Sequence, residues 1–459
     1  MENGVKQALS DIVGKESFTD DLIQLIPYSY DASDHNHRPE VAVWPMSTEQ
    51  VSQILLLASA HRFPVTPRGA GTGLSGGAIP ARGGLIMDMC KMNRILDIRI
   101  ADRQVIVEPG VVYADLENAL ARHGFFFPPD PASSSVCTIG GNVATNAGGI
   151  RGAKYGTTRD YVLGLEVVLP DGRVIRTGSG CIKSSSGLDL SRLFIGSEGT
   201  LGVITEITLK INPKPIATKT SLASFSSLSD AGQSVIEIMH SGIIPSVLEL
   251  LDENTIHVLR EQGRLDLPQA MAMILVETDG YTDGETSFQM DKVIDVLKRN
   301  HATDIRIGRS TKEAEELWKI RRSIGSVAAQ LRTHNVSEDV AVPISKIVDL
   351  ITGISNIVRH YDLPFVIFGH AGDGNLHPRI MYERSDPDQV ERLQKAVGAI
   401  FKLTCELGGT LTGEHGIGLA KASFLHLEHG PVERELMRRI KKLFDPHHIL
   451  NPGKIALDP

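Results

Sequence analysis

Three glycine-rich segments in the first half of the chain restrict its fold more than any other feature. The first, PRGAGTGLSGG, occupies residues 67–77, and five of its eleven residues are glycine. Glycine has no Cβ, so the backbone N–H groups of such a loop can turn toward an anion such as a pyrophosphate. The second segment spans residues 138–162 and the third residues 196–205. Three such segments close together favour a shared ligand over three unrelated turns.

The first loop does not match the common nucleotide-binding fingerprints. A dinucleotide-binding loop opens a helix and is followed by an acidic residue at the end of the next strand, and neither stands in the right place here. The Lys-Ser/Thr ending of a nucleoside triphosphate loop is also missing from residues 67–77. The sequence therefore predicts another kind of phosphate-binding architecture.

The hydrophobic pattern around these loops predicts an α+β domain. Helices are expected over Thr48–His61 and residues 113–123, with short strands between them. Residues 163–178 are expected to form two strands around the turn Pro170-Asp171-Gly172. After the Pro-Lys-Pro segment at 213–215 the glycine-rich loops give way to strands that alternate with long amphipathic helices. We therefore place a domain boundary at this segment. Beyond it we expect a strand at 271–278 and helices at 284–300, 311–331, 388–407 and 432–444.

The segment GHAGDGNLH, residues 369–377, brings two histidines together near a turn signal. If Asp373-Gly374 forms a two-residue hairpin turn, His370 lies directly opposite His377. Directly opposite residues have Cβ atoms roughly 4.5–5.5 Å apart, so the two imidazoles can share a metal ion. The alternative is a pair of ordinary turn histidines. Glu414 and His415, in TLTGEHGIG, form a second ligand-like cluster. Such a set suits zinc, manganese or ferrous iron, and the residue types do not choose among them.

A basic pair stands on a predicted helix, in ELWKIRRSIG at 316–325. Arg321 and Arg322 each offer a planar fork to a carboxylate, and Trp318 lies three residues earlier on the same face as Arg321. The alternative is a solvated basic helix face. His447 and His448 are expected to be structural or surface residues without a role in the site.

Charge and cysteine content exclude several classes of protein. The net charge of −8 gives no basic stripe for nucleic acid. No run of about 18 apolar residues predicts a membrane span, and the N-terminus resembles neither a signal nor a transit peptide. The four cysteines, Cys90, Cys137, Cys181 and Cys405, lack the spacing of zinc ribbons and iron–sulfur clusters. Isolated thiols fit a reducing compartment, so a cytoplasmic protein is expected.

Taken together, PRGAGTGLSGG, PPDPASS…TIGGNVATNAGG and GSEGTLGVITEITLKI resemble the FAD-binding domain of the vanillyl-alcohol oxidase/para-cresol methylhydroxylase flavoproteins. GHAGDGNLH, TGEHGIG and NPGK resemble their D-2-hydroxy acid dehydrogenase branch, which includes D-lactate dehydrogenase, glycolate oxidase catalytic subunits and D-2-hydroxyglutarate dehydrogenase. The resemblance implies an α+β fold with a two-part FAD-binding domain and an α+β cap domain. The expected divisions are an N-terminal helical segment (1–37), the FAD-binding domain (38–215), the cap or substrate domain (216–385) and a helical C-terminal segment closing over the flavin (386–459).

The resemblance also implies how FAD is held. Some relatives attach the flavin covalently to a histidine of the first loop, and this loop has none, so non-covalent FAD is expected. The residues implied in cofactor binding are Pro67, Arg68, Gly69, Gly71, Thr72, Gly73, Leu74, Ser75, Gly76, Pro131, Thr138, Gly141, Asn142, Thr145, Gly148, Tyr155, Gly156, Glu198, Gly202, Ile204 and Asn451.

For the chemistry, the resemblance implies that His370, His377 and Glu414 bind one divalent metal ion and that His415 is the catalytic base. Arg321 would anchor the substrate carboxylate, with Arg322 as the fallback. Trp318 and Asn375 would line the substrate pocket.

The expected substrate is a short D-2-hydroxy acid. Ser337 stands where the hydroxyglutarate enzymes carry a lysine, which favours D-lactate, with glycolate or D-2-hydroxyglutarate as alternatives. Electrons would pass to a separate protein: an electron-transferring flavoprotein, a cytochrome or an iron–sulfur subunit. A homodimer and a subunit of a larger complex both remain open. A metal-dependent hydrolase and a non-redox flavoprotein on the same fold are the alternatives from other classes.

Overall fold

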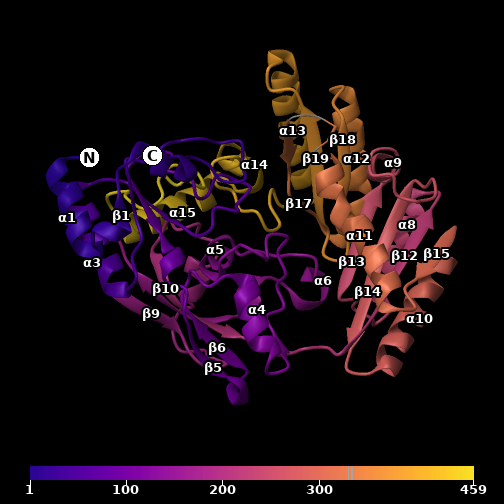
Figure 1. The fold of residues 1–459 in the computed structure, drawn as a ribbon. Coiled ribbons are helices and arrows are strands. Elements are labelled where there is room, and N and C mark those ends of the chain that lie inside the picture. Colours follow the sequence, from indigo (N-terminus) through magenta and orange to yellow (C-terminus); the bar gives the residue numbers. More distant parts are fainter. Residues whose placement is uncertain (329, 332–333, 459) are drawn as a thin grey trace. The chain divides into compact units, whose positions relative to one another are not determined.

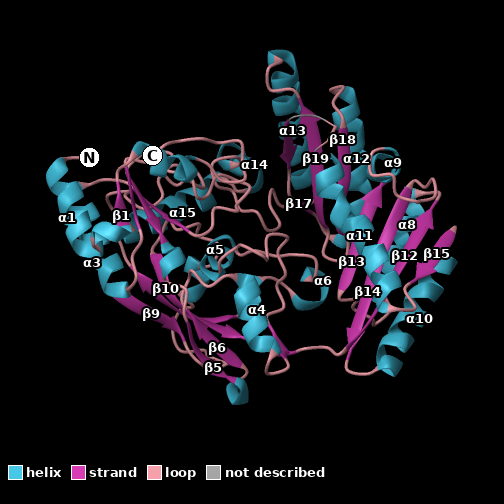
Figure 2. Cartoon of the chain, in the orientation of Figure 1, coloured by secondary structure: helices cyan, strands magenta, loops and turns pink. Residues whose placement is uncertain are grey.

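The computed structural model describes residues 1–328, 330–331 and 334–458, and the chain forms two compact units. Unit 1 comprises residues 1–148, 157–214 and 414–459, and unit 2 comprises residues 149–156 and 215–413 (Figure 1). Both units mix helices and strands, which confirms the expected α+β fold class (Figure 2). Among the described residues, no helix is long and apolar enough to cross a membrane.

The two units group the chain differently from the four predicted segments. Helix α13 (Pro387–Glu406), expected in the C-terminal segment, belongs to unit 2, as do residues 149–156 from the second glycine-rich segment. The helix expected at 311–331 is α11 (Thr311–Ala328), and Ala329 lies outside the described residues.

Unit 1 contains two main sheets in the described part of the chain. One has the order β1-β2-β4-β3, with β3 and β2 parallel to β4, and the other has the antiparallel order β5-β6-β10-β8-β9. The strands are β1 (Phe18–Thr19), β2 (Val41–Val43), β3 (Val65–Arg68), β4 (Leu85–Asp88), β5 (Ile95–Arg99), β6 (Gln104–Val107), β7 (Phe125–Phe126), β8 (Val162–Val168), β9 (Val174–Gly178), β10 (Val203–Lys210) and β11 (Asn212–Pro213). The helices are α1 (Asn3–Val13), α2 (Leu22–Leu25), α3 (Thr48–His61), α4 (Tyr113–Ala121), α5 (Ile139–Thr145), α7 (Ser191–Phe194), α14 (Leu425–Glu428) and α15 (Pro431–Phe444).

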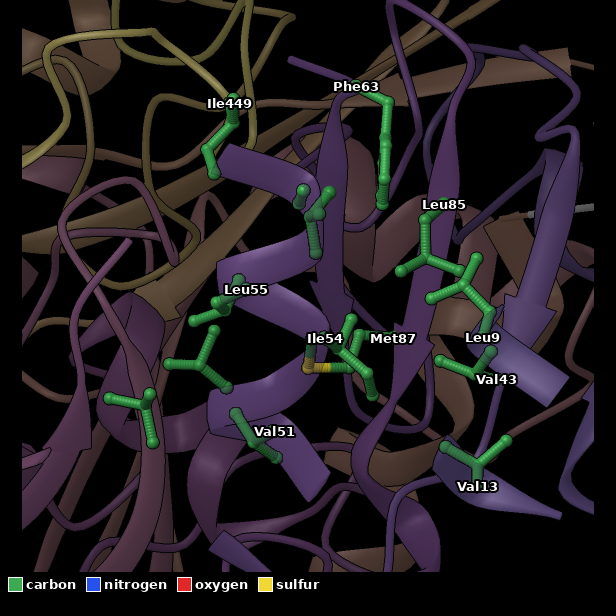
Figure 3. Packing of buried hydrophobic residues seen from close by; sticks show 14 of the residues in the cluster. Leu9, Val13, Val43, Val51, Ile54, Leu55, Phe63, Leu85, Met87 and Ile449 are labelled. Carbon is green, nitrogen blue, oxygen red and sulfur yellow. The ribbon is translucent and has the colours of Figure 1, made fainter. Parts of the chain in front are cut away.

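Helix α3 shows how local sequence builds unit 1. Ser47 caps its start by accepting a hydrogen bond from the Gln50 N–H (3.3 Å), and Arg62 in a left-handed conformation ends it. Val51, Ile54 and Leu55 recur at helical spacing and are fully buried against strands β2 and β4 and helix α1 (Figure 3). Val65 of β3 belongs to the same buried cluster, and the first glycine-rich loop begins at the end of β3.

Unit 2 is built on one antiparallel sheet with the order β15-β12-β14-β13-β18-β19-β16, and β17 pairs with β19. The strands are β12 (Ala217–Phe225), β13 (Val247–Asp252), β14 (Ala272–Gly280), β15 (Asp304–Ile307), β16 (His334–Ser337), β17 (Val340–Ala341), β18 (Phe365–His370) and β19 (Asn375–Tyr382). The further helices are α6 (Gly152–Tyr155), α8 (Leu228–His240), α9 (Glu253–Glu261), α10 (Asp283–Arg299) and α12 (Ile347–His360).

One face of this sheet packs against α9 and α11. Leu251, Phe368 and Met381 point to that face and form a single buried cluster with Ile256 of α9 and Ile320 of α11. Two residues from this cluster on the same face of the sheet, the strands carry polar residues: Glu249 on β13 and His370 on β18. The apolar packing therefore fixes α11 over the strands that carry the two histidines.

Candidate active site

A cavity of about 410 Å³ in unit 1 is lined by all three glycine-rich segments. Loops one and two touch closely, because a Cβ at Gly69 would lie 2.2 Å from Thr138 Oγ1. Most of the predicted cofactor residues line this cavity. They are Pro67, Arg68, Gly69, Gly71, Thr72, Gly73, Leu74, Ser75, Pro131, Thr138, Gly141, Asn142, Thr145, Glu198, Gly202 and Ile204.

The other predicted cofactor residues, Gly76, Gly148, Tyr155, Gly156 and Asn451, lie outside this lining. Tyr155 belongs to unit 2, where its hydroxyl donates to Asp279 Oδ2 (2.6 Å). The Asn451 amide donates to the carbonyl oxygens of Gly77 (2.9 Å) and Glu198 (2.7 Å). Asn451 therefore ties the chain end to the first and third loops.

Arg68 stabilises the first loop through carbonyl oxygens. Its guanidinium donates to the carbonyls of Pro27 (3.2 Å), Tyr30 (2.9 Å) and Ala78 (3.2 Å). Gly71 has φ +70°, and a Cβ there would collide with the same guanidinium. Arg68 thus shapes the loop, while the backbone N–H groups remain the natural donors for a pyrophosphate.

Glu198 joins the third loop to the segment that contains Glu414 and His415. Its buried carboxylate accepts hydrogen bonds from the N–H groups of Ile417 (2.7 Å) and Gly418 (2.8 Å). Burial raises the pKa of Glu198 to about 7, against the opposing effect of these two hydrogen bonds. The tie helps to place Glu414 and His415, which both line the cavity, with His415 Nε2 3.7 Å from Glu414 Oε1.

In unit 2, the predicted pairing of His370 with His377 across a two-residue turn is wrong. His370 pairs with Asn375 and His377 pairs with Phe368, so four residues, 371–374, form the turn. Within the turn the Asp373 N–H donates to the His370 carbonyl (3.4 Å) and the Gly374 N–H to the Ala371 carbonyl (3.4 Å), and the Gly372 N–H donates to the Leu248 carbonyl (3.2 Å) on the neighbouring strand. A shift of two residues keeps side chains on the same face of a sheet, so both imidazoles still point the same way.

The two imidazole rings meet edge to face, and each has a carboxylate behind it. Their Nε2 atoms are 3.3 Å apart and their centroids 5.0 Å apart. His370 Nδ1 hydrogen-bonds to Glu249, and His377 Nδ1 lies 3.7 Å from Asp339 Oδ1. Carboxylates behind ring nitrogens orient histidine ligands in metal sites. With metal–nitrogen bonds of roughly 2.0–2.1 Å and tetrahedral angles, two nitrogen ligands lie about 3.3 Å apart, so the pair fits such an ion.

Glu249 connects this histidine pair to Arg321. Its buried carboxylate bonds both Arg321 Nε and His370 Nδ1. Burial alone raises the pKa of Glu249, but the charges of Arg321 and His370 outweigh it and lower the pKa to about 2. The structure therefore places Arg321 beside the histidines, whereas Arg322 is exposed and pairs with Glu315.

The side-chain nitrogens of two other predicted substrate residues, Trp318 and Asn375, donate hydrogen bonds to groups of the protein. Trp318 Nε1 donates to Glu277 Oε2 (2.9 Å), and Asn375 Nδ2 donates to Asp339 Oδ1 (2.8 Å) and the Val340 carbonyl (3.2 Å). Asn375 and Trp318 lie in the same unit as the histidine pair.

Sequence reasoning missed Glu249, Asp339 and Arg379. Glu249 carried a signal, since it is a carboxylate inside the apolar run VLELLD. Arg379 carried one too, because it lies two residues after His377 and therefore on the same face of β19. Burial, and then the charge of Arg321, lowers the pKa of Arg379.

Comparisons with known proteins agree on one family. The family described as FAD linked oxidases, C-terminal domain, matches residues 214–455, and the FAD binding domain family matches residues 39–178. Glycolate oxidase subunit GlcD of Bacillus subtilis is 42% identical over 453 residues, which cover 98% of this chain and 96% of that protein. The mitochondrial D-lactate dehydrogenase [cytochrome] of Arabidopsis thaliana is 37% identical over 421 residues, covering 91% and 73%. The structure of p-cresol methylhydroxylase with substrate bound has a TM-score of 0.84 at 20% identity, covering 99% and 97% of the two chains.

Proposed function

The chain belongs to the FAD-linked oxidases of the vanillyl-alcohol oxidase/para-cresol methylhydroxylase type, in the branch of glycolate oxidase subunits and D-lactate dehydrogenases, and from this premise we propose its reaction. It oxidises a short D-2-hydroxy acid to the 2-oxo acid with FAD and a divalent metal ion. The observation that carries this proposal is the pair of Nε2 atoms 3.3 Å apart, with Glu249 bonding both His370 and Arg321.

The metal ligands in this proposal are His370, His377 and Glu414. Zinc, manganese and ferrous iron all accept imidazole and carboxylate ligands, and the 3.3 Å spacing of the two Nε2 atoms is compatible with each of them. The position of Glu414 in the chain, two residues after Thr412, supports its role as the third metal ligand. Thr412 donates its hydroxyl to Asp339 Oδ2 (2.6 Å), behind His377, and Glu414 follows two residues later. Consecutive Cα atoms are about 3.8 Å apart, so the Glu414 Cα lies within about 7.6 Å of the Thr412 Cα.

The protein residues then have distinct roles. Arg321 binds and orients the substrate carboxylate, and His415 takes the proton of the 2-hydroxyl group. Trp318 and Asn375 belong to the surroundings of the substrate, whereas the exposed Arg322, paired with Glu315, does not. When bound, FAD would supply the hydride acceptor and the metal ion would supply a Lewis acid for the hydroxyl group. The glycine-rich loops supply backbone donors for the FAD pyrophosphate.

D-lactate is expected to reduce the bound flavin faster than glycolate, D-2-hydroxybutyrate or D-2-hydroxyglutarate. The reason is Ser337, a small neutral residue where the hydroxyglutarate enzymes carry a lysine for the longer acid. Anaerobic rapid mixing with each acid, followed by flavin absorbance, measures the rates, and L-lactate serves as the control that should leave the flavin oxidised. Faster bleaching by D-2-hydroxyglutarate than by D-lactate would contradict this assignment.

The flavin is expected to be non-covalent, because the loop at residues 67–77 contains no histidine that could bond to it. Acid precipitation of the purified protein should leave the yellow colour in the supernatant. A covalently flavinylated relative treated in the same way provides the control. Yellow protein in the washed pellet would show that another residue forms the bond.

Electrons are expected to leave reduced FAD through a separate protein, with electron-transferring flavoprotein favoured over a cytochrome or an iron–sulfur subunit. Two relatives named as an oxidase subunit and as a cytochrome-linked dehydrogenase support this expectation. Turnover with D-lactate should be slow in air and fast when an artificial dye acceptor is added. Equally rapid turnover with oxygen alone would rule it out. We further propose cytoplasmic action, since Cys90, Cys137, Cys181 and Cys405 are isolated from one another in the sequence, which fits a reducing compartment.

A further inference from the structure

The Phe368 ring of β18 is the common neighbour of three functional groups. The guanidinium carbon of Arg321 lies 4.9 Å from the ring centroid, and that of Arg379 lies 5.9 Å from it. The centroid of the His377 ring lies 5.8 Å from the same point. Two guanidinium groups and one member of the histidine pair therefore gather around a single side chain of unit 2.

The two arginines differ in how their charge is balanced. Arg321 bonds to the buried carboxylate of Glu249, which offsets its charge. Arg379 has no carboxylate within 4.0 Å among the residues that the structure describes, and its hydrogen bond runs from Nη1 to the Gly325 carbonyl (3.1 Å). Its Nε is buried and has no hydrogen-bond partner within the same described residues. A buried charged donor without an acceptor destabilises the folded protein. An anion that accepts a hydrogen bond from Arg379 Nε would remove that cost.

Two neighbours of Arg379 in the sheet are uncharged and do not offset its charge. Its direct cross-strand partner on β16 is Ser337, which is small and uncharged. Met381, two residues further along β19 on the same face, belongs to the buried apolar cluster beneath α11. Glu249 offsets the charge of Arg321, and a carboxylate group of the substrate would offset that of Arg379.

We propose that Arg379 is a substrate-binding residue that holds the carboxylate of the 2-hydroxy acid together with Arg321. This inference rests on the proposed function for the identity of the anion. A single carboxylate between two guanidinium groups relieves the repulsion between them and supplies the acceptor that Arg379 Nε lacks. Arg321 then binds two carboxylates, that of the substrate and that of Glu249, which orients His370.

The test uses the oxidised holoenzyme and 2-hydroxyisobutyrate, which has the carboxylate and hydroxyl of the substrate but no hydrogen to transfer. Its binding is followed by the change in flavin absorbance. Arg379→Gln should weaken that binding roughly 10- to 100-fold, which corresponds to about 1.4–2.8 kcal/mol and is the size expected for a hydrogen bond to a charged group. KM for D-lactate should rise by a similar factor, with a smaller change in kcat. Lactamide, the uncharged analogue, should bind the variant and the wild type equally.

The matched control is Arg384→Gln, which removes an exposed arginine just beyond the same strand and should change neither constant. Arg379→Lys covers the case in which the glutamine variant does not fold. It keeps the charge but loses the planar fork, so it should weaken 2-hydroxyisobutyrate binding by a smaller factor.

Several outcomes would overturn the inference. Unchanged 2-hydroxyisobutyrate binding in the foldable Arg379 variants would do so, even if D-lactate is oxidised and the proposed function stands. A loss confined to D-2-hydroxyglutarate, with D-lactate unaffected, would also do so, because it would assign Arg379 to the far end of a longer acid. If no 2-hydroxy acid reduces the flavin but Arg379→Gln still weakens 2-hydroxyisobutyrate binding, the proposed function fails while the anion site holds.

Discussion

His370→Ala and His377→Ala are expected to lose the metal ion, whereas His415→Ala should keep it and lose turnover. The first two residues supply the Nε2 atoms that lie 3.3 Å apart, and loss of a ligand should weaken metal binding by more than the roughly 10–100-fold seen for outer-shell partners. His415 lines the cavity of the glycine-rich loops, where a base would act. Its loss should slow flavin reduction about 10²–10⁴-fold. Metal analysis and single-turnover reduction rates of the purified variants measure both effects.

A chelator should reproduce the two metal-site variants and leave FAD bound. FAD is expected to survive because the cavity lined by the glycine-rich loops lies within unit 1, whereas His370 and His377 belong to unit 2. The flavin absorbance of the protein fraction after gel filtration is the control measurement. If His415→Ala loses its metal as completely as His370→Ala, then His415 is a ligand and another residue is the base.

Glu249→Gln is expected to damage stability and metal binding together. The buried carboxylate bonds Arg321 and His370, and removing one partner of a buried ion pair costs about 3–5 kcal/mol of the free energy of unfolding. It also orients His370, so metal affinity should fall roughly 10–100-fold. Denaturant unfolding and metal titration of the same preparation measure the two losses. The matched control is Glu391→Gln, since Glu391 forms an exposed pair with Lys395 (2.6 Å) and its loss should leave the free energy of unfolding nearly unchanged.

The pH dependence of unfolding provides an independent check on Glu249. Its pKa is about 2 in the folded protein, against an ordinary value of 4.5 for a glutamate, so the folded state favours the charged form. The resulting stabilisation is complete above about pH 4.5 and is lost as the pH falls through about 2. Glu249→Gln should therefore flatten this part of the stability profile. An unchanged slope between pH 4.5 and 2 would show that the ion pair contributes nothing.

Sequence pattern alone was enough for the elements whose signals are local. Helix α3 has its predicted bounds, Thr48–His61, because its cap and its apolar spacing lie within the helix itself. The turn Pro170-Asp171-Gly172 joins β8 and β9 as predicted, because it needs only its own residues. The resemblance carried by the glycine-rich and histidine motifs also identified the family, since these motifs are specific in combination.

The hairpin of the two histidines shows where local signals fail. Asp373-Gly374 predicted a two-residue turn, but the actual turn has four residues, 371–374, and one of them, Gly372, bonds to Leu248 of β13. That partner is more than a hundred residues away in sequence, so no local pattern could report it. The two imidazoles still meet, because a shift of two residues preserves the face of the strand.

The order of amino acids was sufficient to identify the family, the glycine-rich loops and the types of residue that could bind a metal ion and a carboxylate. The tertiary structure decided which of them act together. Glu249 comes from β13, Arg321 from α11 and Arg379 from β19, and only the pairing of β13, β18 and β19 beneath α11 brings them around Phe368 and the histidines. The physical reason is that sheet pairing joins residues far apart in sequence, and the buried packing of α11 then selects Arg321 over Arg322.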